Sequence, residues 1–123
     1  MFKPTDGRLT LIRPSVYVIV NEKTETLYIG QSDKPFLRWS YHVDDASKKK
    51  YPLHIAMDQD GLENFSFHIL KVCKNDAEAR DQELRTIAAC VDLGYSLYNL
   101  RDITVEENPY IREFQQKRVQ RAS

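Results

Sequence analysis

The sequence predicts an α/β domain, with a small three-stranded antiparallel sheet, helices packed on it as a sandwich, and a C-terminal tail helix. Two observations carry this prediction. Three short segments are rich in β-branched residues or alternate between apolar and polar residues, as strands do. Between and after them lie segments that begin with capping residues or proline and carry apolar side chains at helical spacing. The length, 123 residues, suits one domain with a single core.

The first two strands should form a hairpin. Residues Val16–Val20 are a β-branched run, residues Thr26–Gly30 are a second strand candidate, and the polar NEKTE between them is typical of a hairpin loop. Because side chains alternate along a strand, a turn centred in this loop places Tyr17 opposite or diagonal to Tyr28 on one face. At Gly30 the missing side chain permits a turn or the close approach of another backbone.

A helix should follow the hairpin. Ser32 or Asp33 can cap it, Pro35 lies in its first turn, and it should end near Asp45. Three large apolar side chains are expected to form its core face: Phe36, Trp39 and Val43.

A short helix, a third strand and a longer helix should complete the core. The short helix should begin near Pro52 and end at Gly61, which can take the left-handed conformation. The alternating FSFHILKV is expected to be the third strand, and a capping-box pattern at Asn75 opens a helix to about Val91. The following GYSLYNL should be irregular or a short extended piece. Asn108 and the proline after it should start the C-terminal helix.

The chain is expected to divide into an N-terminal extension (1–14), a globular core (15–100) and a basic tail helix (101–123). Eighteen basic and eighteen acidic residues give a formal net charge of zero, whereas nucleic-acid binders usually carry a positive excess. Composition alone therefore does not favour nucleic-acid binding. Two basic clusters could contact phosphates or be solvated surface: Lys48, Lys49 and Lys50, and Lys117, Arg118 and Arg121.

Cysteine usage and hydropathy indicate the compartment. Cys73 and Cys90 lack the spacing of a metal site and are expected to be reduced, buried thiols. No apolar run approaches the roughly 18 to 20 residues of a membrane span, and the N-terminus has no apolar signal segment. These features predict an intracellular, cytoplasmic protein.

Polar side chains recur at spacings that suit a site, although each pattern also has a plain structural explanation. The two hairpin tyrosines can form an ordinary cross-strand pair. Arg38 and His42 share one face of the first helix, which can simply be solvated. Glu83 lies at the edge of an apolar helix stripe, so its carboxylate should meet a cation, a metal or hydrogen-bond donors, or else reach solvent. His54 is expected to be solvated and His68 to be structural.

The order of these features resembles the GIY-YIG nuclease family, and most closely its phage and homing-type catalytic domains. The segments SVYVIV, LYIG, FLRWSYH, QELRTI and YNL carry the resemblance, which covers about residues 15–100. It assigns six residues to the catalytic set: Tyr17, Tyr28, Arg38, His42, Glu83 and Asn99. Gly30 closes the second name-giving triplet. Ser15 and Val16 depart from the family's glycine and isoleucine, and Leu37 stands where the homing branch often has lysine.

The resemblance implies a metal-dependent endonuclease that hydrolyses phosphodiester bonds in DNA. Glu83 would be the sole protein ligand of Mg²⁺, for which Mn²⁺ can substitute. Arg38 would stabilise phosphate charge, Tyr28 would orient the water or the phosphate, and Asn99 would hold the substrate backbone or a catalytic tyrosine. Tyr17 is favoured as the general base with assistance from its neighbouring histidine, but that histidine as the direct base stays open.

Only about two dozen residues follow YNL, so we expect low intrinsic sequence specificity, or specificity supplied by a partner protein. Two alternatives stay open. One is a nuclease for single-stranded or branched nucleic acid, either DNA or RNA. The other is a non-catalytic member that binds nucleic acid or a protein. The sequence does not indicate an oligomeric state.

Overall fold

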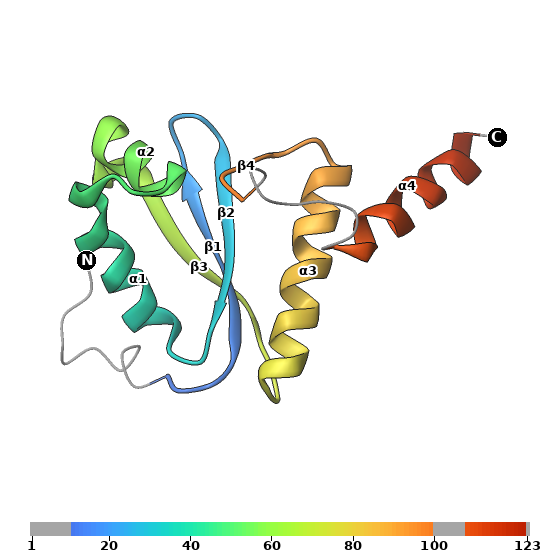
Figure 1. Ribbon diagram of the computed structural model, residues 1–123, viewed down its shortest axis with the longest axis horizontal. Helices are drawn as coiled ribbons and strands as arrows, with labels where there is room; N and C mark the ends of the chain where they lie inside the picture. Colours follow the sequence, from blue (N-terminus) through green and yellow to red (C-terminus); the bar gives the residue numbers. More distant parts are fainter. Residues whose placement is uncertain (1–10, 100–107, 123) are drawn as a thin grey trace.

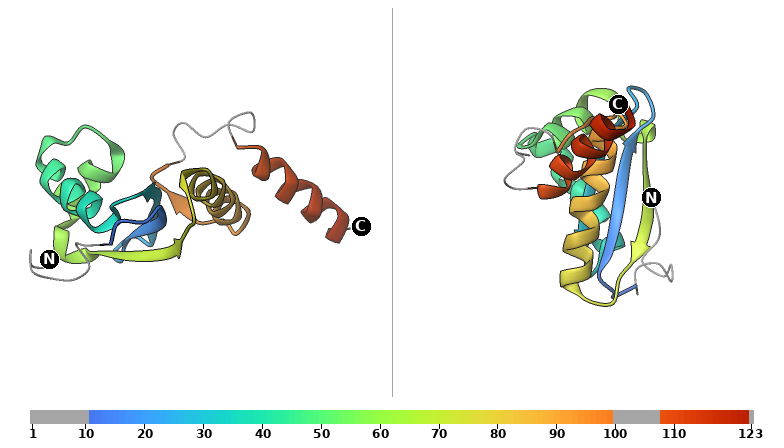
Figure 2. Two further views of the ribbon diagram at one scale, coloured as in Figure 1. Left: turned by 90° about the horizontal axis from the view of Figure 1, so that it is seen from below. Right: turned by 90° about the vertical axis from the view of Figure 1, so that its right-hand side faces the viewer.

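The computed structural model describes residues 11–99 and 108–122, with the side chains of the last helix described up to Lys117. The helices are α1 (Pro35–Asp45), α2 (Pro52–Asp60), α3 (Asp76–Asp92) and α4 (Pro109–Ala122). Helices α1 and α2 cover one face of the sheet and α3 covers the other, while α4 packs on α3 away from the sheet (Figures 1 and 2). The predicted α/β sandwich with a C-terminal helix is confirmed.

The sheet contains one strand more than predicted. In spatial order it runs β3 (Phe65–Val72), β1 (Ser15–Asn21), β2 (Thr26–Ser32) and β4 (Ser96–Leu97). β1 is antiparallel to both of its neighbours, whereas β4 pairs in parallel with Thr26 and Leu27 of β2. The expectation of three strands missed β4 because a two-residue strand has no alternating pattern. Its pairing depends on where α3 returns the chain to the sheet.

The hairpin has the predicted arrangement of its tyrosines. Tyr17 is paired with Gly30 and Tyr28 with Ile19, so the two tyrosines are diagonal on one face, with ring centroids 6.3 Å apart. Gly30 is needed because the Tyr17 ring crosses its Cα, and an added Cβ would overlap that ring. The close approach expected at Gly30 is therefore made by a side chain rather than by a backbone.

The helices begin and end within two residues of their predicted bounds, but one cap differs. The N-cap of α1 is Lys34 without a side-chain hydrogen bond, and the hydroxyl of Ser32 instead accepts from the Lys34 N–H at 3.0 Å. The cap of α3 is as predicted, because the Asn75 side chain accepts from the Glu78 N–H at 2.8 Å. Gly61, after α2, has a positive φ of 87°, but its ψ of 136° differs from that of the left-handed conformation expected there.

The two faces of the sheet are packed differently. Between the sheet and α3 lies a cluster of buried apolar residues and one cysteine: Val16, Val18, Ile29, Cys73, Ala79, Ile87 and Leu97. The face under α1 and α2 has its own apolar cluster: Ile19, Ala46, Leu53, Ala56, Met57 and Phe65. The expected core face of α1 packs on this second cluster, where Trp39 stacks on Phe67 at 5.4 Å between ring centroids. Cys73 is buried as expected, Cys90 is half-buried, and both are free thiols.

The first turn of α4 docks on α3. Asn108 is buried and donates from Nδ2 to the carbonyl of Leu84 at 2.8 Å, while Ile111 is buried nearby. The guanidinium of Arg85 lies 4.2 Å from the ring centroid of Tyr110. Within the described parts of the chain, no helix has the length and apolar character that crossing a bilayer needs.

Candidate active site

Tyr17 and His42 form the centre of the candidate site. Tyr17 belongs to β1 and His42 to α1, and the Tyr17 hydroxyl lies 2.9 Å from Nε2 of His42. Both residues are buried, with exposed fractions of 1% and 4%. The face of α1 that carries His42 therefore contacts the sheet and α2, and the alternative of a solvated face is wrong for His42. This contact joins β1 to α1 through two residues that are 25 positions apart in the sequence.

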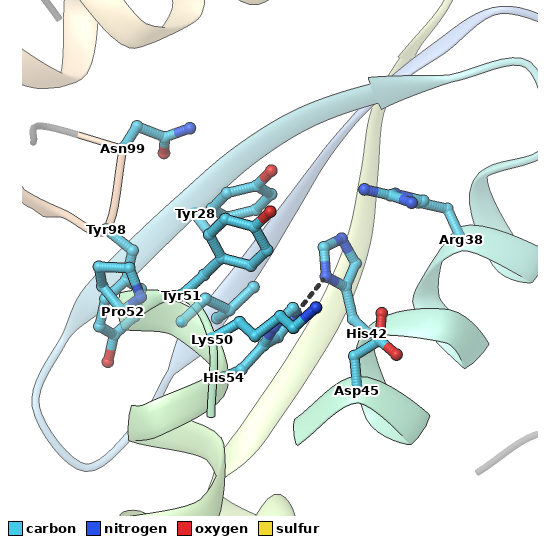
Figure 3. A pocket seen from close by; sticks show the side chains of 11 residues that line it. Tyr28, Arg38, His42, Asp45, Lys50, Tyr51, Pro52, His54, Tyr98 and Asn99 are labelled. Carbon is cyan, nitrogen blue, oxygen red and sulfur yellow. Dashed lines mark hydrogen bonds between the residues drawn. The ribbon is translucent and has the colours of Figure 1, made fainter. Parts of the chain in front are cut away.

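A second histidine extends this contact. Nδ1 of His42 lies 3.1 Å from Nε2 of His54 on α2 (Figure 3). The expectation that His54 is solvated is wrong, because it is 6% exposed and packs between the two helices. It precedes the buried Met57 by one helical turn, and this spacing is the sequence signal that could have placed it inside. The other ring nitrogen of His54, Nδ1, has no hydrogen-bond partner among the described residues.

Burial holds both members of the central contact in their neutral forms. It raises the pKa of Tyr17 well above its usual range, and Tyr28 adds to this rise while the charge and hydrogen bond of Arg38 oppose it. Burial, with the nearby charges of Arg38 and His54, lowers the pKa of His42 to about 4. At neutral pH His42 is therefore an uncharged imidazole, which has one nitrogen able to accept a proton.

A cavity of about 630 Å³ opens beside these residues. Tyr28, Arg38 and His42 line it together with the segment from Lys50 to His54 (Figure 3). The Tyr28 ring lies edge-on to His42, with centroids 5.4 Å apart. Arg38 projects from α1 towards the same space, and its charge lowers the pKa of both hairpin tyrosines. The cavity thus brings the Arg38 cation next to the Tyr28 phenol and the His42 imidazole, whereas Tyr17 contacts His42 but does not itself line the cavity.

Glu83 belongs to α3, which covers the face of the sheet opposite α1 and α2, and it is not among the residues that line the cavity. Its negative charge contributes to the rise in the pKa of both Tyr17 and Tyr28. The side chain is only 12% exposed, and its Oε1 lies 2.6 Å from Nη1 of Arg80. Burial outweighs this ion pair and raises the pKa of Glu83. The carboxylate therefore has one cationic partner and has not been left to solvent.

The donor set suits one kind of metal. The described residues contain no group of three or more potential ligands from His, Cys, Asp and Glu. A single carboxylate is the arrangement in which Mg²⁺ keeps several water ligands and binds substrate phosphate. The Glu83 site therefore fits Mg²⁺ or Mn²⁺ and does not fit a metal that needs a complete protein cage.

This geometry can be compared with known families. The family model described as the GIY-YIG catalytic domain matches residues 13–90, which is more than half of the chain. The chain belongs to the GIY-YIG family. No curated protein and no solved structure matches it. The matched span includes five of the six predicted GIY-YIG site residues, and Asn99 lies beyond it. The assignment to the phage and homing-type branch stays a prediction.

Asn99 closes the GIY-YIG core from the end of the sheet. Its Oδ1 accepts from the Ile29 N–H at 2.9 Å, and its Nδ2 donates to the Ile29 carbonyl at 2.8 Å. The amide side chain thus continues the pairing of β4 along β2, next to Tyr28. Because both polar atoms are used in this way, the geometry favours the option that Asn99 holds a tyrosine-bearing strand over the option that it binds substrate.

The predicted phosphate-binding lysines of this GIY-YIG chain separate into different environments. Lys48 forms an ion pair with Asp45 and Lys49 with Asp58, whereas Lys50 lines the cavity. Lys117 lies on α4, where it forms an ion pair with Glu113. The side chains of Arg118 and Arg121 fall outside the described residues.

The departure from the family pattern at Ser15 has a local explanation. Ser15 is fully buried, and its hydroxyl donates to the carbonyl of Arg13 at 2.8 Å. The hydroxyl is therefore satisfied within the chain at the start of β1 and does not face the GIY-YIG cavity lined by Arg38 and Tyr28. The other two departures, Val16 and Leu37, also lie outside the cavity lining.

Proposed function

We propose that this GIY-YIG chain is a metal-dependent endonuclease that hydrolyses DNA phosphodiester bonds with low intrinsic sequence specificity. The observation that carries the proposal is the buried contact between the Tyr17 hydroxyl and Nε2 of His42, beside Arg38 and Glu83. Membership of a nuclease family supports hydrolysis of a nucleic acid. The catalytic activity of this chain, DNA as the substrate, the metal and the low specificity are the proposed parts.

The proton path follows from the neutral state of the central pair. With a pKa raised by burial, Tyr17 is protonated at neutral pH and cannot act as a base unless its own proton leaves. The neutral His42 can accept that proton at Nε2 as Tyr17 takes one from the attacking water. The water's oxygen then forms the new bond to phosphorus while the bond to the leaving oxygen breaks.

His54 has a positioning role in this path. For Nε2 of His42 to accept, the proton of that imidazole must lie on Nδ1, from which it can be donated to Nε2 of His54. Donation to His54 also stabilises the imidazolium that forms when His42 takes the Tyr17 proton. The second histidine therefore selects the productive tautomer and holds the ring towards Tyr17.

The remaining residues would stabilise charge and orient the substrate. Arg38 would contact a non-bridging phosphate oxygen, and Tyr28 would orient the phosphate or the water. Glu83 would hold the divalent cation, which when bound supplies neutralisation of phosphate charge and of the leaving oxygen. Arg80, which occupies one oxygen of Glu83, would compete with the cation for it.

Low specificity is proposed from the distribution of charge. The formal net charge is zero, so affinity for DNA would come from the cations around the cavity rather than from a long-range field. Base recognition in the grooves needs side chains presented on a helix or ribbon, and the cavity lies between α1 and α2. A partner protein could add sequence preference.

The test is nicking of supercoiled plasmid in Mg²⁺, Mn²⁺ or EDTA by the wild type and by Glu83→Gln. We expect metal-dependent nicking by the wild type and a loss of at least about 100-fold in the variant, since a metal ligand contributes several kcal/mol. Glu63→Gln is the matched control, because the Glu63 side chain is exposed whereas that of Glu83 is largely buried. If a folded wild type fails to cut, the proposal is wrong and a binding role replaces it.

A further inference from the structure

The cavity extends beyond the residues proposed for chemistry. Its far wall is formed by Lys50, Tyr51, Pro52 and Leu53, ahead of and within the first turn of α2 (Figure 3). A volume of about 630 Å³ lies inside the range of roughly 300 to 1,000 Å³ that holds a small-molecule-sized group. The phosphate contact proposed for Arg38 would occupy only one end of it, so a second group of the substrate can enter.

Tyr51 is an oriented aromatic platform on this wall. The side chain is exposed, at 62%, yet its backbone is restrained. Pro52 follows it and keeps Tyr51 extended, with φ −123° and ψ 156°, and the Tyr51 carbonyl accepts from the Ile55 N–H at 3.0 Å. The ring also lies edge-on to His54, with centroids 5.6 Å apart. A restrained ring with an exposed face is the feature on which nucleobases stack.

Lys50 is a cation available to a ligand. Its two preceding lysines are engaged in ion pairs, with Asp45 and with Asp58. Across the described chain, by contrast, Lys50 has neither a hydrogen bond nor an ion pair, although it lines the cavity. The chain turns at Lys49, whose φ is 53°, between the two ion-paired lysines and Lys50 at the cavity.

The charge around the cavity suits an anion. Arg38 and Lys50 are its cations, its two histidines are neutral at pH 7, and the one carboxylate, Asp45, is already paired with Lys48. An anionic group bearing an aromatic ring would satisfy both cations and Tyr51. In a duplex both faces of each base are covered by stacked neighbours, so only a nucleotide with an unpaired, unstacked base can offer such a ring.

We propose that the cavity binds the nucleotide next to the scissile phosphate in unpaired form, with its base stacked on Tyr51 and its own phosphate contacting Lys50. This inference rests on the proposed nuclease function and gives it a substrate class, single strands and unpaired ends or flaps. It makes Tyr51 and Lys50 substrate-binding residues that lie outside the catalytic set.

The experiment separates binding from cleavage. Fluorescence anisotropy in the Glu83→Gln background measures the Kd for a short labelled single strand and for the same sequence as a duplex. We expect Tyr51→Ala to weaken single-strand binding about 10-fold, equivalent to about 1.4 kcal/mol, and duplex binding less than about 2-fold. Tyr51→Phe should restore the single-strand affinity, because stacking needs the ring and not the hydroxyl. Lys50→Ala should weaken single-strand binding and flatten its salt dependence.

Two controls match these variants. Tyr41→Ala removes another exposed tyrosine, from α1 outside the cavity lining, and Lys74→Ala removes an exposed positive charge from the loop before α3. Neither should change the preference for a single strand. A 2-aminopurine base at the predicted position should be quenched in the Tyr51 protein and not in Tyr51→Ala, which reports stacking directly.

The inference is overturned if Tyr51→Ala changes both Kd values equally, or neither, or if the wild-type side chain leaves the 2-aminopurine unquenched. Wild-type affinity that is no higher for the single strand than for the duplex also overturns it. Failure of the nuclease proposal would look different, since Glu83→Gln and the wild type would then show the same lack of cleavage while the binding preference persists.

Discussion

The two faces of one small sheet bury different kinds of side chain. Alternation along β1 directs Val16 and Val18 towards α3, where the cluster contains apolar residues and a cysteine. It directs Tyr17, Ile19 and Asn21 towards α1 and α2. On that side the buried polar groups are joined in chains. Tyr17 contacts His42 and then His54, and Asn21 donates to Asp60 at 2.9 Å and to Tyr98 at 3.0 Å.

This difference separates a purely apolar face from a face that combines an apolar cluster with the proposed site. Burying an apolar side chain is favourable wherever the shape allows it, whereas burying a phenol or an imidazole costs free energy unless it finds a partner. A buried polar chain ending at a cavity, with shifted pKa values, is a physical indication of a functional site. Substitution of the buried apolar residues under α3 should therefore act on stability, whereas substitution in the polar chain of the opposite face should act mainly on activity.

The largest expected effect is on catalysis, from Tyr17→Phe. The variant keeps the ring that packs over Gly30 and removes the hydroxyl that would exchange protons with water and His42. We expect cleavage to fall by about 100- to 10,000-fold, the usual contribution of a general base. Stability should fall by about 1 to 3 kcal/mol at most, because the buried Nε2 of His42 loses its hydrogen-bond partner. Single-turnover kinetics measure the cleavage. A loss of only a few-fold would show that Tyr17 is not the base and that His42 acts on the water directly.

The complementary change on the other face is Ile29→Ala. Ile29 is 1% exposed and belongs to the α3-side cluster, so truncation leaves a cavity that should lower the free energy of unfolding by about 2 to 5 kcal/mol. Its neighbour in sequence, Tyr28, faces the site, and Tyr28→Phe should reduce cleavage while moving the urea midpoint much less. Equal loss of stability in both variants would contradict the division between the faces.

The site face should also make stability depend on pH. The pKa of His42 is about 4 in the fold against 6.5 in the unfolded chain, so between these values the unfolded state binds a proton that the native state does not. Stability should thus fall by about 1 to 3 kcal/mol as the pH drops from about 6.5 to about 4. His54, whose pKa is lowered too, acts in the same direction.

Urea unfolding at several pH values measures this dependence, which His42→Gln should flatten. The control is His68→Gln, since His68 is exposed on β3. A pH dependence in His42→Gln as steep as that of the wild type would place its origin elsewhere.

The smallest effect is expected at His54, which acts through His42. His54→Leu removes one hydrogen bond and should lower the cleavage rate by up to about 10-fold without raising KM. His54→Gln places an amide near the position of Nε2 and should recover much of the rate. The profile of rate against pH is the deciding measurement, because a merely structural residue would alter stability and leave the pH of half-maximal rate in place.

The sequence by itself predicted the helices, three of the four described strands and the shared faces of several candidate site residues. Strand alternation and the loop length were enough to place Tyr17 and Tyr28 on one face of the hairpin, and the register then made them diagonal rather than opposite. The spacing of Arg38 and His42 put both on one helix face, and the capping pattern at Asn75 began α3 correctly. These features depend on residues close together in the chain, where propensity and periodicity act directly.

Only the tertiary structure decided which of those faces is buried. A short helix such as α1 can turn either side to the sheet, and α2 covers the side that carries His42 because His54 and Leu53 pack there. Lys48 and Lys49 form ion pairs with Asp45 and Asp58, whereas Lys50 does not. Asn99 hydrogen-bonds to Ile29 because the chain returns to the sheet after α3. Each outcome depends on a partner far away in the sequence or across a turn, so no local pattern encodes it.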